Sequence, residues 1–337
     1  DFSKGHWATM AQLGWLGLTI PEAEGGFGGN QVDTMVIMEQ FGKGLVLEPF
    51  FASIVLGARA VVLGATEDLR GQVLPGVIDG SRQLACAYAE EQARFDLHDV
   101  VTRARPESDG FIINGQKSMV QHGGTADQIV VSARTSGGQT DTDGISLFLI
   151  DASSAGVETT SFATVDGLAA AEIQFNDVHV PASRLLGAQD QGYELLQQVA
   201  IDGILAVSAE AVGAMEMLYK DTVQYTQERE QFDHPLADFQ VLQHRMVDMF
   251  MEYEQAKSLL YRATLEVVQN GVGAMRTVHA LKHFIGKTGI MIGENAVQLH
   301  GGMGVTEELR IGHYFKRLLV IDAQFGNSDY HLQQFAA

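Results

Sequence analysis

The chain has 337 residues, 46% of them hydrophobic, which is enough for a large core and for two or three domains. Its formal net charge of −20 at pH 7 argues against nucleic acid or an anionic membrane surface as a partner. The single cysteine, Cys86, excludes a disulfide within the chain, and its apolar neighbours predict a buried thiol that fits a reducing cytoplasm.

Residues 1–84 are predicted to form an N-terminal α-helical domain. Apolar side chains recur at helical spacing near Trp7, over residues 32–41 and over residues 53–63. The glycine-rich stretch over residues 13–31 does not predict a phosphate loop, because no strand precedes it and no Lys-Ser/Thr follows it. No membrane span and no signal peptide are predicted. The chain starts within a helical pattern, so we expect its N-terminal part to be truncated.

From residue 85 to residue 187 the apolar spacing changes to a period of two, which predicts a middle β domain. Asn114-Gly115, between Phe111–Ile113 and the residues after Gln116, predicts a two-residue hairpin. Further strands are predicted from QIVVSAR, GISLFLI and EIQFNDVHV, which polar, glycine-bearing turns separate.

Residues 188–337 are predicted to form a C-terminal four-helix bundle. Apolar stripes with steps of three and four run over residues 204–225, 239–253 and 278–299. The last of these helices is predicted to stop at Gly301-Gly302, where the missing Cβ atoms would let the backbone approach a bulky anionic ligand. A plain helix stop is the alternative interpretation of the two glycines.

Several motifs together resemble the acyl-CoA dehydrogenase family. QLHGGMG is followed by E-L-R-I-x-x-Y-F-K-R and a G-x-S turn, and residues 225–240 match Y-x-x-x-R-x-x-F-x-x-P-[IL]-x-x-F-Q. The order of helical domain, β domain and helical bundle is also that of the family. The resemblance implies an α+β multidomain fold, FAD as cofactor and the α,β-dehydrogenation of acyl-CoA thioesters. In that reaction a carboxylate removes the α-proton while a hydride leaves the β-carbon for the flavin. No metal site is predicted.

The resemblance assigns two residue sets of the helical bundle to FAD. In the first, Arg229 meets the pyrophosphate, for which a guanidinium is well suited, and Phe232 packs near the adenine end. For Arg229 taken alone, a solvated helix charge is the alternative. Both sets characteristically reach a neighbouring subunit's flavin, which implies an oligomer. The assigned residues are Arg229, Gln231, Phe232, Leu236, Phe239 and Gln240 in the first set, and Gln298, Leu299, Gly301 and Gly302 in the second.

The β domain departs from the family pattern. EEQARFDL, residues 90–97, stands where the family has T-E-P-x-A-G-S-D, and Met119-Val120-Gln121 replaces the W-I-[TS] that contacts the flavin ring. Backbone contacts can survive these changes, and the Gln121 side chain can still bond the ring edge. The flavin contacts expected from this domain are Ala89, Glu90, Met119 and Gln121.

The usual catalytic base is missing from the sequence. Phe325 replaces the family's glutamate directly before the G-[TS]-S turn, and the alternative base position aligns with Gly203. Asp202, Asp322 and Asp329 are the possible substitutes, but each is explained more readily as a solvated or helix-end acid.

The variants E-x-Q-x-R-F-D-L and GHYFKRL resemble the small subunits of two-subunit acyl-CoA dehydrogenases, such as the pimeloyl-CoA dehydrogenase small subunit. In such pairs one chain can keep the glutamate that its partner lacks. We therefore expect a cytoplasmic flavoprotein of fatty acid or acyl-CoA catabolism that pairs with a homologous catalytic subunit in a heterotetramer. The resemblance implies an electron-transferring flavoprotein as acceptor. A self-sufficient homo-oligomeric enzyme with a relocated base, and a non-catalytic scaffold of the same fold, are the alternatives.

Overall fold

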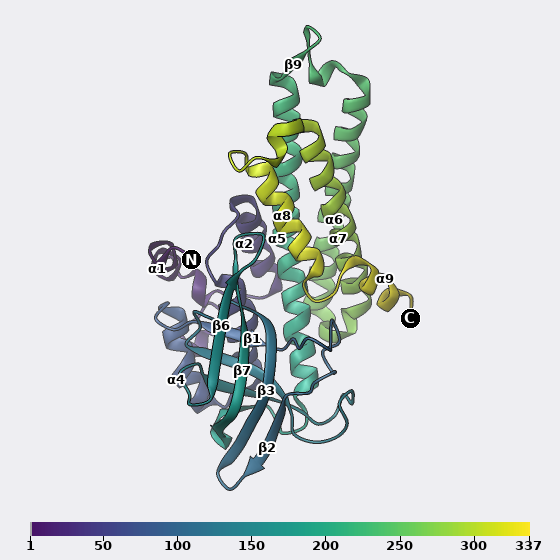
Figure 1. Cartoon of the computed structure of the whole chain (residues 1–337). Helices are drawn as coiled ribbons and strands as arrows, with labels where there is room; N and C mark the ends of the chain where they lie inside the picture. The colour runs from purple at the N-terminus through teal and green to yellow at the C-terminus, as the bar shows by residue number, and fades with distance from the viewer. Residues whose placement is uncertain (1) are drawn as a thin grey trace. The chain divides into compact units, whose positions relative to one another are not determined.

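The computed structural model describes residues 2–337, which divide into two compact units. The first unit contains the chain up to Asp33 together with Leu47–Gly203, and the second contains Thr34–Val46 together with Ile204–Ala337. The predicted order of helices, β sheet and helical bundle is confirmed along the chain (Figure 1). The domain boundaries at residues 84 and 187 remain predictions.

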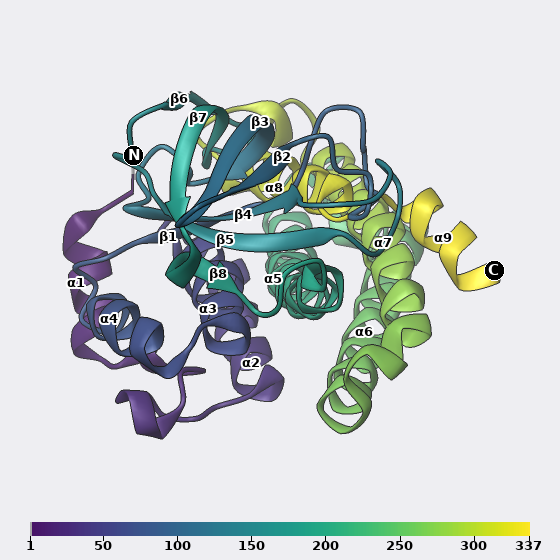
Figure 2. The ribbon, with the colours of Figure 1, turned by 90° about the horizontal axis from the view of Figure 1, so that it is seen from below.

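At the start of two helices of the first unit, a polar side chain accepts a hydrogen bond from a backbone N–H that has no partner within the helix. Ser3 Oγ accepts from His6 (3.2 Å) at the start of α1, and Thr66 Oγ1 accepts from Leu69 (3.3 Å) at the start of α4. Figure 2 shows α1, α3 and α4 on one side of the sheet. The elements are α1 (Lys4–Gln12), the 3₁₀ turns η1 (Trp15–Gly17) and η2 (Glu22–Glu24), the π-helix η3 (Phe51–Ala58), α3 (Arg59–Gly64) and α4 (Glu67–Ile78).

The glycine-rich stretch over residues 13–31 is a tight loop of the first unit. A Cβ on Gly26 would lie 2.1 Å from the carbonyl oxygen of Ile20, and the amide of Gly28 donates to the same oxygen (2.9 Å). The glycines here therefore serve the close approach of one backbone segment to another.

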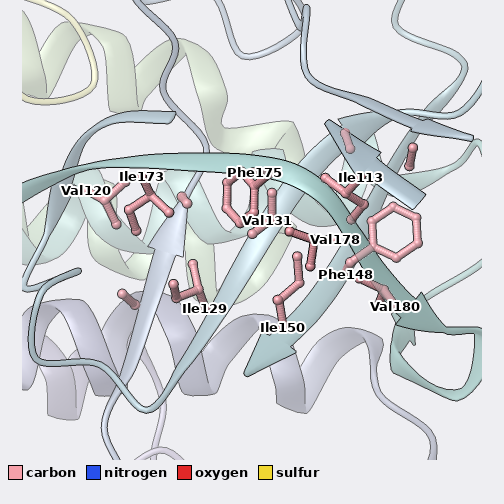
Figure 3. Packing of buried hydrophobic residues seen from close by; sticks show 14 of the residues in the cluster. Ile113, Val120, Ile129, Val131, Phe148, Ile150, Ile173, Phe175, Val178 and Val180 are labelled. Carbon is pink, nitrogen blue, oxygen red and sulfur yellow. The ribbon is translucent and has the colours of Figure 1, made fainter. Parts of the chain in front are cut away.

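An eight-stranded sheet forms the rest of the first unit. Its order is β6-β7-β3-β2-β4-β5-β8, and β1 pairs with β4 in parallel. Ile113, Phe148 and Phe175, none more than 1% exposed, belong to the core on this sheet (Figure 3). The strands are β1 (Leu84–Ala87), β2 (Arg103–Glu107), β3 (Gly110–Gln121), β4 (Gln128–Arg134), β5 (Ile145–Asp151), β6 (Val157–Ala163), β7 (Ala169–Pro181) and β8 (Leu185–Leu186).

The predicted hairpin at Asn114-Gly115 is wrong. β3 continues through these residues, and the hairpin lies between β2 and β3, where Glu107 pairs with Gly110. Gly115 instead marks a register shift in the pairing of β3 with β7 and has a φ of 148°. A Cβ there would lie 2.5 Å from Thr102 Oγ1. The backbone freedom of Asn-Gly is used for a β-bulge, which needs it as much as a turn does.

Long helices form most of the second unit, and Figure 1 shows α5, α6, α7 and α8 running side by side. Within this unit α2 crosses α5 at two glycines. A Cβ on Gly42 would lie 1.9 Å from the carbonyl oxygen of Glu210, and one on Gly213 would lie 2.0 Å from that of Glu39. The elements are α2 (Gln31–Gly44), α5 (Gly192–Glu228), β9 (Glu230–Gln231), β10 (His234–Pro235), η5 (Leu236–Asp238), α6 (Gln240–Asn270), η6 (Gly271–Ala274), α7 (Met275–His300), η7 (Gly301–Val305), α8 (Arg310–Ala323) and α9 (Ser328–Ala336).

Within residues 2–337, α5 is the one helix that is long and apolar enough to cross a membrane by length and composition. Of its apolar window, 83% is buried inside the structure, and an enclosed core helix gives the same signal. The sequence prediction of no membrane span considered uninterrupted apolar runs and so did not consider α5.

Candidate functional site

Arg229 and Phe232 lie at the hairpin that connects α5 to α6. The amide of Arg229 donates to the Tyr225 carbonyl and its carbonyl accepts from Leu236, both at 2.8 Å, so the backbone is fixed while the side chain is exposed. Phe232 and Asp233 form the turn between β9 and β10 with φ angles of 58° and 62°. Glycine or asparagine is the usual choice in such a turn, so a phenylalanine here is energetically costly. Its ring is nevertheless 85% exposed.

The second predicted set lies where α7 ends. Gly301 has a φ of 60°, and a Cβ on Gly301 or Gly302 would meet no atom within 4 Å. The glycine backbone therefore faces open space. The other predicted residues of the two sets vary in burial: Gln231, Gln240 and Gln298 are exposed, Leu236 and Phe239 are half-buried, and Leu299 is buried.

One contact joins the two sets. The ring of Tyr225 stacks on the ring of His300, with centroids 4.3 Å apart, and its hydroxyl donates to the His300 carbonyl (3.5 Å). His300 Nδ1 lies 2.8 Å from the Ala296 carbonyl, and burial lowers the pKa of this histidine below its ordinary value. Nδ1 of the neutral ring therefore donates to that carbonyl. The stacked pair fixes the end of α7, from which Gly301 and Gly302 continue.

These features fit a dinucleotide cofactor. An exposed guanidinium can bond phosphate oxygens, and an exposed aromatic ring can stack on a purine. Glycines that face open space leave room for a ligand to reach the backbone amides. The fit depends on residues that are exposed in this chain at some cost in backbone strain, which is typical of a binding site.

In the first unit, Met119 and Gln121 lie at a β-bulge near the end of β3. The pairing of β3 with β7 shifts register between Lys117 and Val120, and Met119 has a φ of 52°. The bulge leaves the Met119 side chain 53% exposed, and Gln121 is half-buried. A bulge with left-handed, non-glycine backbone is a common feature of functional sites.

The carboxylate of Glu90 is hydrogen-bonded within the first unit. It accepts hydrogen bonds from Lys117 Nζ (2.6 Å) and from the amide of Val101 (2.7 Å), and it is 4% exposed. Burial alone would raise the pKa of Glu90, but Lys117 and the backbone donor outweigh it and hold this pKa below its ordinary value. The carbonyl of Ala89 accepts from Ser118 (2.9 Å). The Glu90 carbonyl also accepts from the amide of Ala93 (3.2 Å), so the side chain and the carbonyl of Glu90 are both bonded within the first unit. A contact of Glu90 with the cofactor remains a prediction.

Phe325 lies in the turn between α8 and α9, with a φ of 59°, and Gly326 follows with a φ of 116°. Lys282 Nζ of α7 donates to the carbonyls of Asp322 and Gly326, both at 2.8 Å. His331 Nε2 of α9 lies 3.1 Å from the Phe325 carbonyl. Phe325, the position at which the sequence predicts a missing base, is thus part of a densely bonded turn.

The three aspartates considered as substitute bases each have a structural role. Asp202 is 7% exposed and accepts from Arg59 Nε (2.7 Å), from Gln31 and from Gln198. Asp322 Oδ1 accepts from the amide of Ser328 (2.9 Å) at the start of α9. Asp329 is exposed in the first turn of α9, where the helix dipole favours an acid. Asp322 and Asp329 are thus helix-end acids as predicted, whereas Asp202 is a buried, ion-paired residue within α5 and is neither solvated nor at a helix end. The identity of the base remains a prediction.

Sequence reasoning missed Lys282, although the sequence carries a signal for it. His279, Lys282, His283 and Gly286 repeat at i, i+3, i+4 and i+7 on α7, beside the apolar stripe. A polar stripe that includes a fully buried lysine must bond something on a neighbouring element.

Family models for the acyl-CoA dehydrogenase N-terminal, middle and C-terminal domains match residues 1–81, 85–178 and 190–337. Together these three matches cover most of the chain.

Known proteins agree with this match. The caffeyl-CoA reductase-Etf complex subunit CarC of Acetobacterium woodii is 29% identical over 95% of this chain and 85% of its own length. The solved butyryl-CoA dehydrogenase of Megasphaera elsdenii is 25% identical, with a TM-score of 0.92 over 99% of this chain and 89% of that one. A chain of the ChsE4-ChsE5 complex from Mycobacterium tuberculosis is also 25% identical, with a TM-score of 0.89 over 99% and 87%.

Proposed function

Because the chain belongs to the acyl-CoA dehydrogenase family of FAD-dependent oxidoreductases, we propose that it is the subunit without the catalytic base in a two-subunit acyl-CoA dehydrogenase. The observation that carries this proposal is the presence of Phe325 where the family has its glutamate, in a chain that keeps the exposed residues expected to bind FAD.

The helical bundle supplies the cofactor contacts in this proposal. Arg229 pairs with the pyrophosphate, Phe232 lies against the adenine end, and the amides of Gly301 and Gly302 approach the cofactor from the end of α7. When bound, FAD accepts the hydride that leaves the β-carbon of the acyl thioester. In the first unit, the bulge that presents Met119 and Gln121 is the proposed contact for the flavin ring.

Proton removal is the step that this chain does not perform for itself. The α-proton of a thioester needs a carboxylate within hydrogen-bond reach, and a phenyl ring cannot accept a proton. We assign that role to a glutamate on a homologous partner, which supplies the base at its own site. We expect an electron-transferring flavoprotein to reoxidise the cofactor, and a cytoplasmic location remains a prediction.

The surface of α6 supports a partner of this kind. Its buried face contains Met246, Met249, Tyr253, Ala256 and Leu260, whereas a second apolar stripe is exposed to solvent. That stripe, which we call the α6 stripe, has two parts that are ten residues apart, and within each part the apolar residues recur at steps of three and four, as in a helix-packing seam. Its apolar members are Val247 (54% exposed), Met251 (50%), Tyr261 (39%), Leu265 (53%) and Val268 (41%). We propose that a helix of the partner's bundle covers it.

The visible spectrum of the purified chain, with added FAD and a panel of acyl-CoA thioesters, tests the proposal. We expect a yellow protein whose flavin no thioester bleaches, until a homologous chain with the glutamate is added. Bleaching by the chain alone would instead support a relocated base. A chain that takes up no FAD even with such a partner would support the scaffold interpretation.

Arg229→Gln tests the cofactor assignment separately. Loss of a charge-assisted bond to phosphate should weaken FAD binding roughly ten- to a hundredfold. Arg105→Gln is the matched control, because the Arg105 side chain is 70% exposed on β2 and has no assigned role in the site. Equal FAD affinity for Arg229→Gln and Arg105→Gln would contradict the assignment.

A further inference from the structure

The turn that carries Phe325 has an unusual backbone. Phe325 and Gly326 are consecutive residues with φ angles of 59° and 116°. Glycine reaches such angles freely, but a bulky L-residue in the left-handed region is strained. Strain of this kind persists only where the surrounding structure fixes the backbone, so residues that neighbour the turn must hold it in place.

Lys282 bonds the turn on both sides of Phe325. Its side chain is 0% exposed on α7, and Nζ donates to the carbonyl of Asp322 before the turn and to that of Gly326 within it. One ammonium group therefore holds the end of α8 and the left-handed glycine together. A buried lysine is costly, and two carbonyl acceptors partly compensate its charge.

His331 holds the Phe325 carbonyl itself. It is 1% exposed, and burial together with the nearby Lys282 lowers its pKa to about 3, so its ring is neutral. Because Nε2 faces a carbonyl, it carries the proton, and Nδ1 accepts from His279 Nδ1 (2.8 Å). Asp322 Oδ1 also accepts from the amide of Ser328. We call the bonds that Lys282, His331 and Asp322 make around position 325 the frame.

We propose that Lys282 and His331 are positioning residues that fix the backbone at position 325 whatever side chain stands there. The inference rests on the proposed function, in which Phe325 takes the place of the family's base. The chain has then lost the carboxylate but kept the frame that would present one. A glutamate placed at position 325 should accordingly act as a base.

A comparison of glycine and alanine at position 325 tests the frame without flavin or substrate. If the backbone is held left-handed, Phe325→Gly should have a roughly three- to tenfold larger folding equilibrium constant than Phe325→Ala. In the Lys282→Met background, which removes the donor at similar volume, that ratio should fall to one or below. Glycine then loses its advantage and keeps only its larger entropy cost.

Two results would overturn the inference: equal stability of the two variants in the wild-type background, or an unchanged ratio in Lys282→Met. If Lys282→Met does not fold, His331→Phe replaces it, because it removes the bond to the Phe325 carbonyl and keeps a ring of similar size. The ratio of the folding equilibrium constants of Phe325→Gly and Phe325→Ala should fall in that background as well. An unchanged ratio there would contradict the proposed role of His331.

Phe325→Glu tests the consequence for chemistry. In the FAD-loaded chain, thioester-dependent bleaching should appear with Phe325→Glu, and its rate should fall at least roughly tenfold when Lys282→Met is added, with thioester affinity unchanged. An FAD-loaded Phe325→Glu chain that no thioester bleaches would overturn the positioning role. A chain that takes up no FAD even with a homologous partner contradicts the proposed function instead, while the glycine–alanine comparison still decides whether Lys282 and His331 hold the backbone.

Discussion

Lys282 should make the stability of the second unit depend on pH in the alkaline range. Burial lowers the pKa of Lys282 from 10.5 to about 8, and the nearby Asp322 carboxylate offsets that effect only in part. The unfolded chain, in which this lysine is hydrated, keeps the ordinary value. Between pH 8 and 10.5 the unfolded state therefore binds more protons than the native state, and the free energy of unfolding rises with pH.

The size of the effect follows from the pKa. Each pH unit between about 8 and 10.5 is worth ~1.36 kcal/mol, so the native state gains roughly 3 kcal/mol across the whole window. Below pH 8 both states hold the proton, and Lys282 contributes no further slope. Between pH 8 and 9.5 the expected gain is about 2 kcal/mol.

The assay is urea unfolding of the wild type and of Lys282→Met at several pH values, followed by far-UV circular dichroism. Tryptophan fluorescence is unsuitable, because Trp7 and Trp15, the two tryptophans of the chain, belong to the other unit. The difference between wild type and Lys282→Met isolates this one lysine from other groups that titrate in the same range. Lys287→Met, at an exposed position of α7, is the matched control and should keep the wild-type slope. Parallel curves for wild type and Lys282→Met would refute the reasoning.

Two further predictions concern packing and assembly. Gly42→Ala places a Cβ 1.9 Å from the Glu210 carbonyl oxygen and should destabilise the chain by at least roughly 1–3 kcal/mol, seen as a lower Tm; Gly71→Ala, with nothing within 4 Å on α4, should leave the Tm unchanged or raise it. Equal Tm values for the two variants would contradict the close crossing of α2 and α5. Met251→Glu in the α6 stripe should weaken association with a co-expressed homologous catalytic chain at least roughly tenfold in sedimentation, whereas Gln72→Glu, at an exposed position of α4, should not. Intact association with Met251→Glu would exclude the α6 stripe as the partner surface.

The sequence predicts the long helices well, because their signal is local and repeated. Val278, Leu281, Ile285 and Ile292 form the predicted stripe of α7, and all are at most 1% exposed. The hairpin prediction at Asn114-Gly115 failed for the opposite reason. A dipeptide reports backbone freedom, but the partner strands decide whether that freedom becomes a turn or a bulge.

The polar contacts of the site could not be predicted, because they join residues that are distant in sequence. The Glu90 carboxylate meets Lys117 across 27 positions, and Lys282 meets Gly326 across 44. Neither pair has a motif, and glutamate and lysine are most often found at the surface. The sequence predicts that a carboxylate is missing at Phe325 and places Lys282 in a polar stripe of α7, but the bonds from Lys282 to the turn around Phe325 were visible only in three dimensions.

At the proposed site, the side chains and the backbone lead to different expectations about which functions this chain keeps. Phe325, Phe232 and Met119 are bulky residues with left-handed backbone, and the resemblance had assigned each of these positions to cofactor or chemistry. In a chain that had merely lost its function, nothing would oppose relaxation of such strain by glycine or by a different turn. Backbones that are still held at a cost, in a chain whose Phe325 cannot abstract a proton, favour a site that still binds and orients. This is the pattern we expect of a subunit whose partner performs the proton transfer.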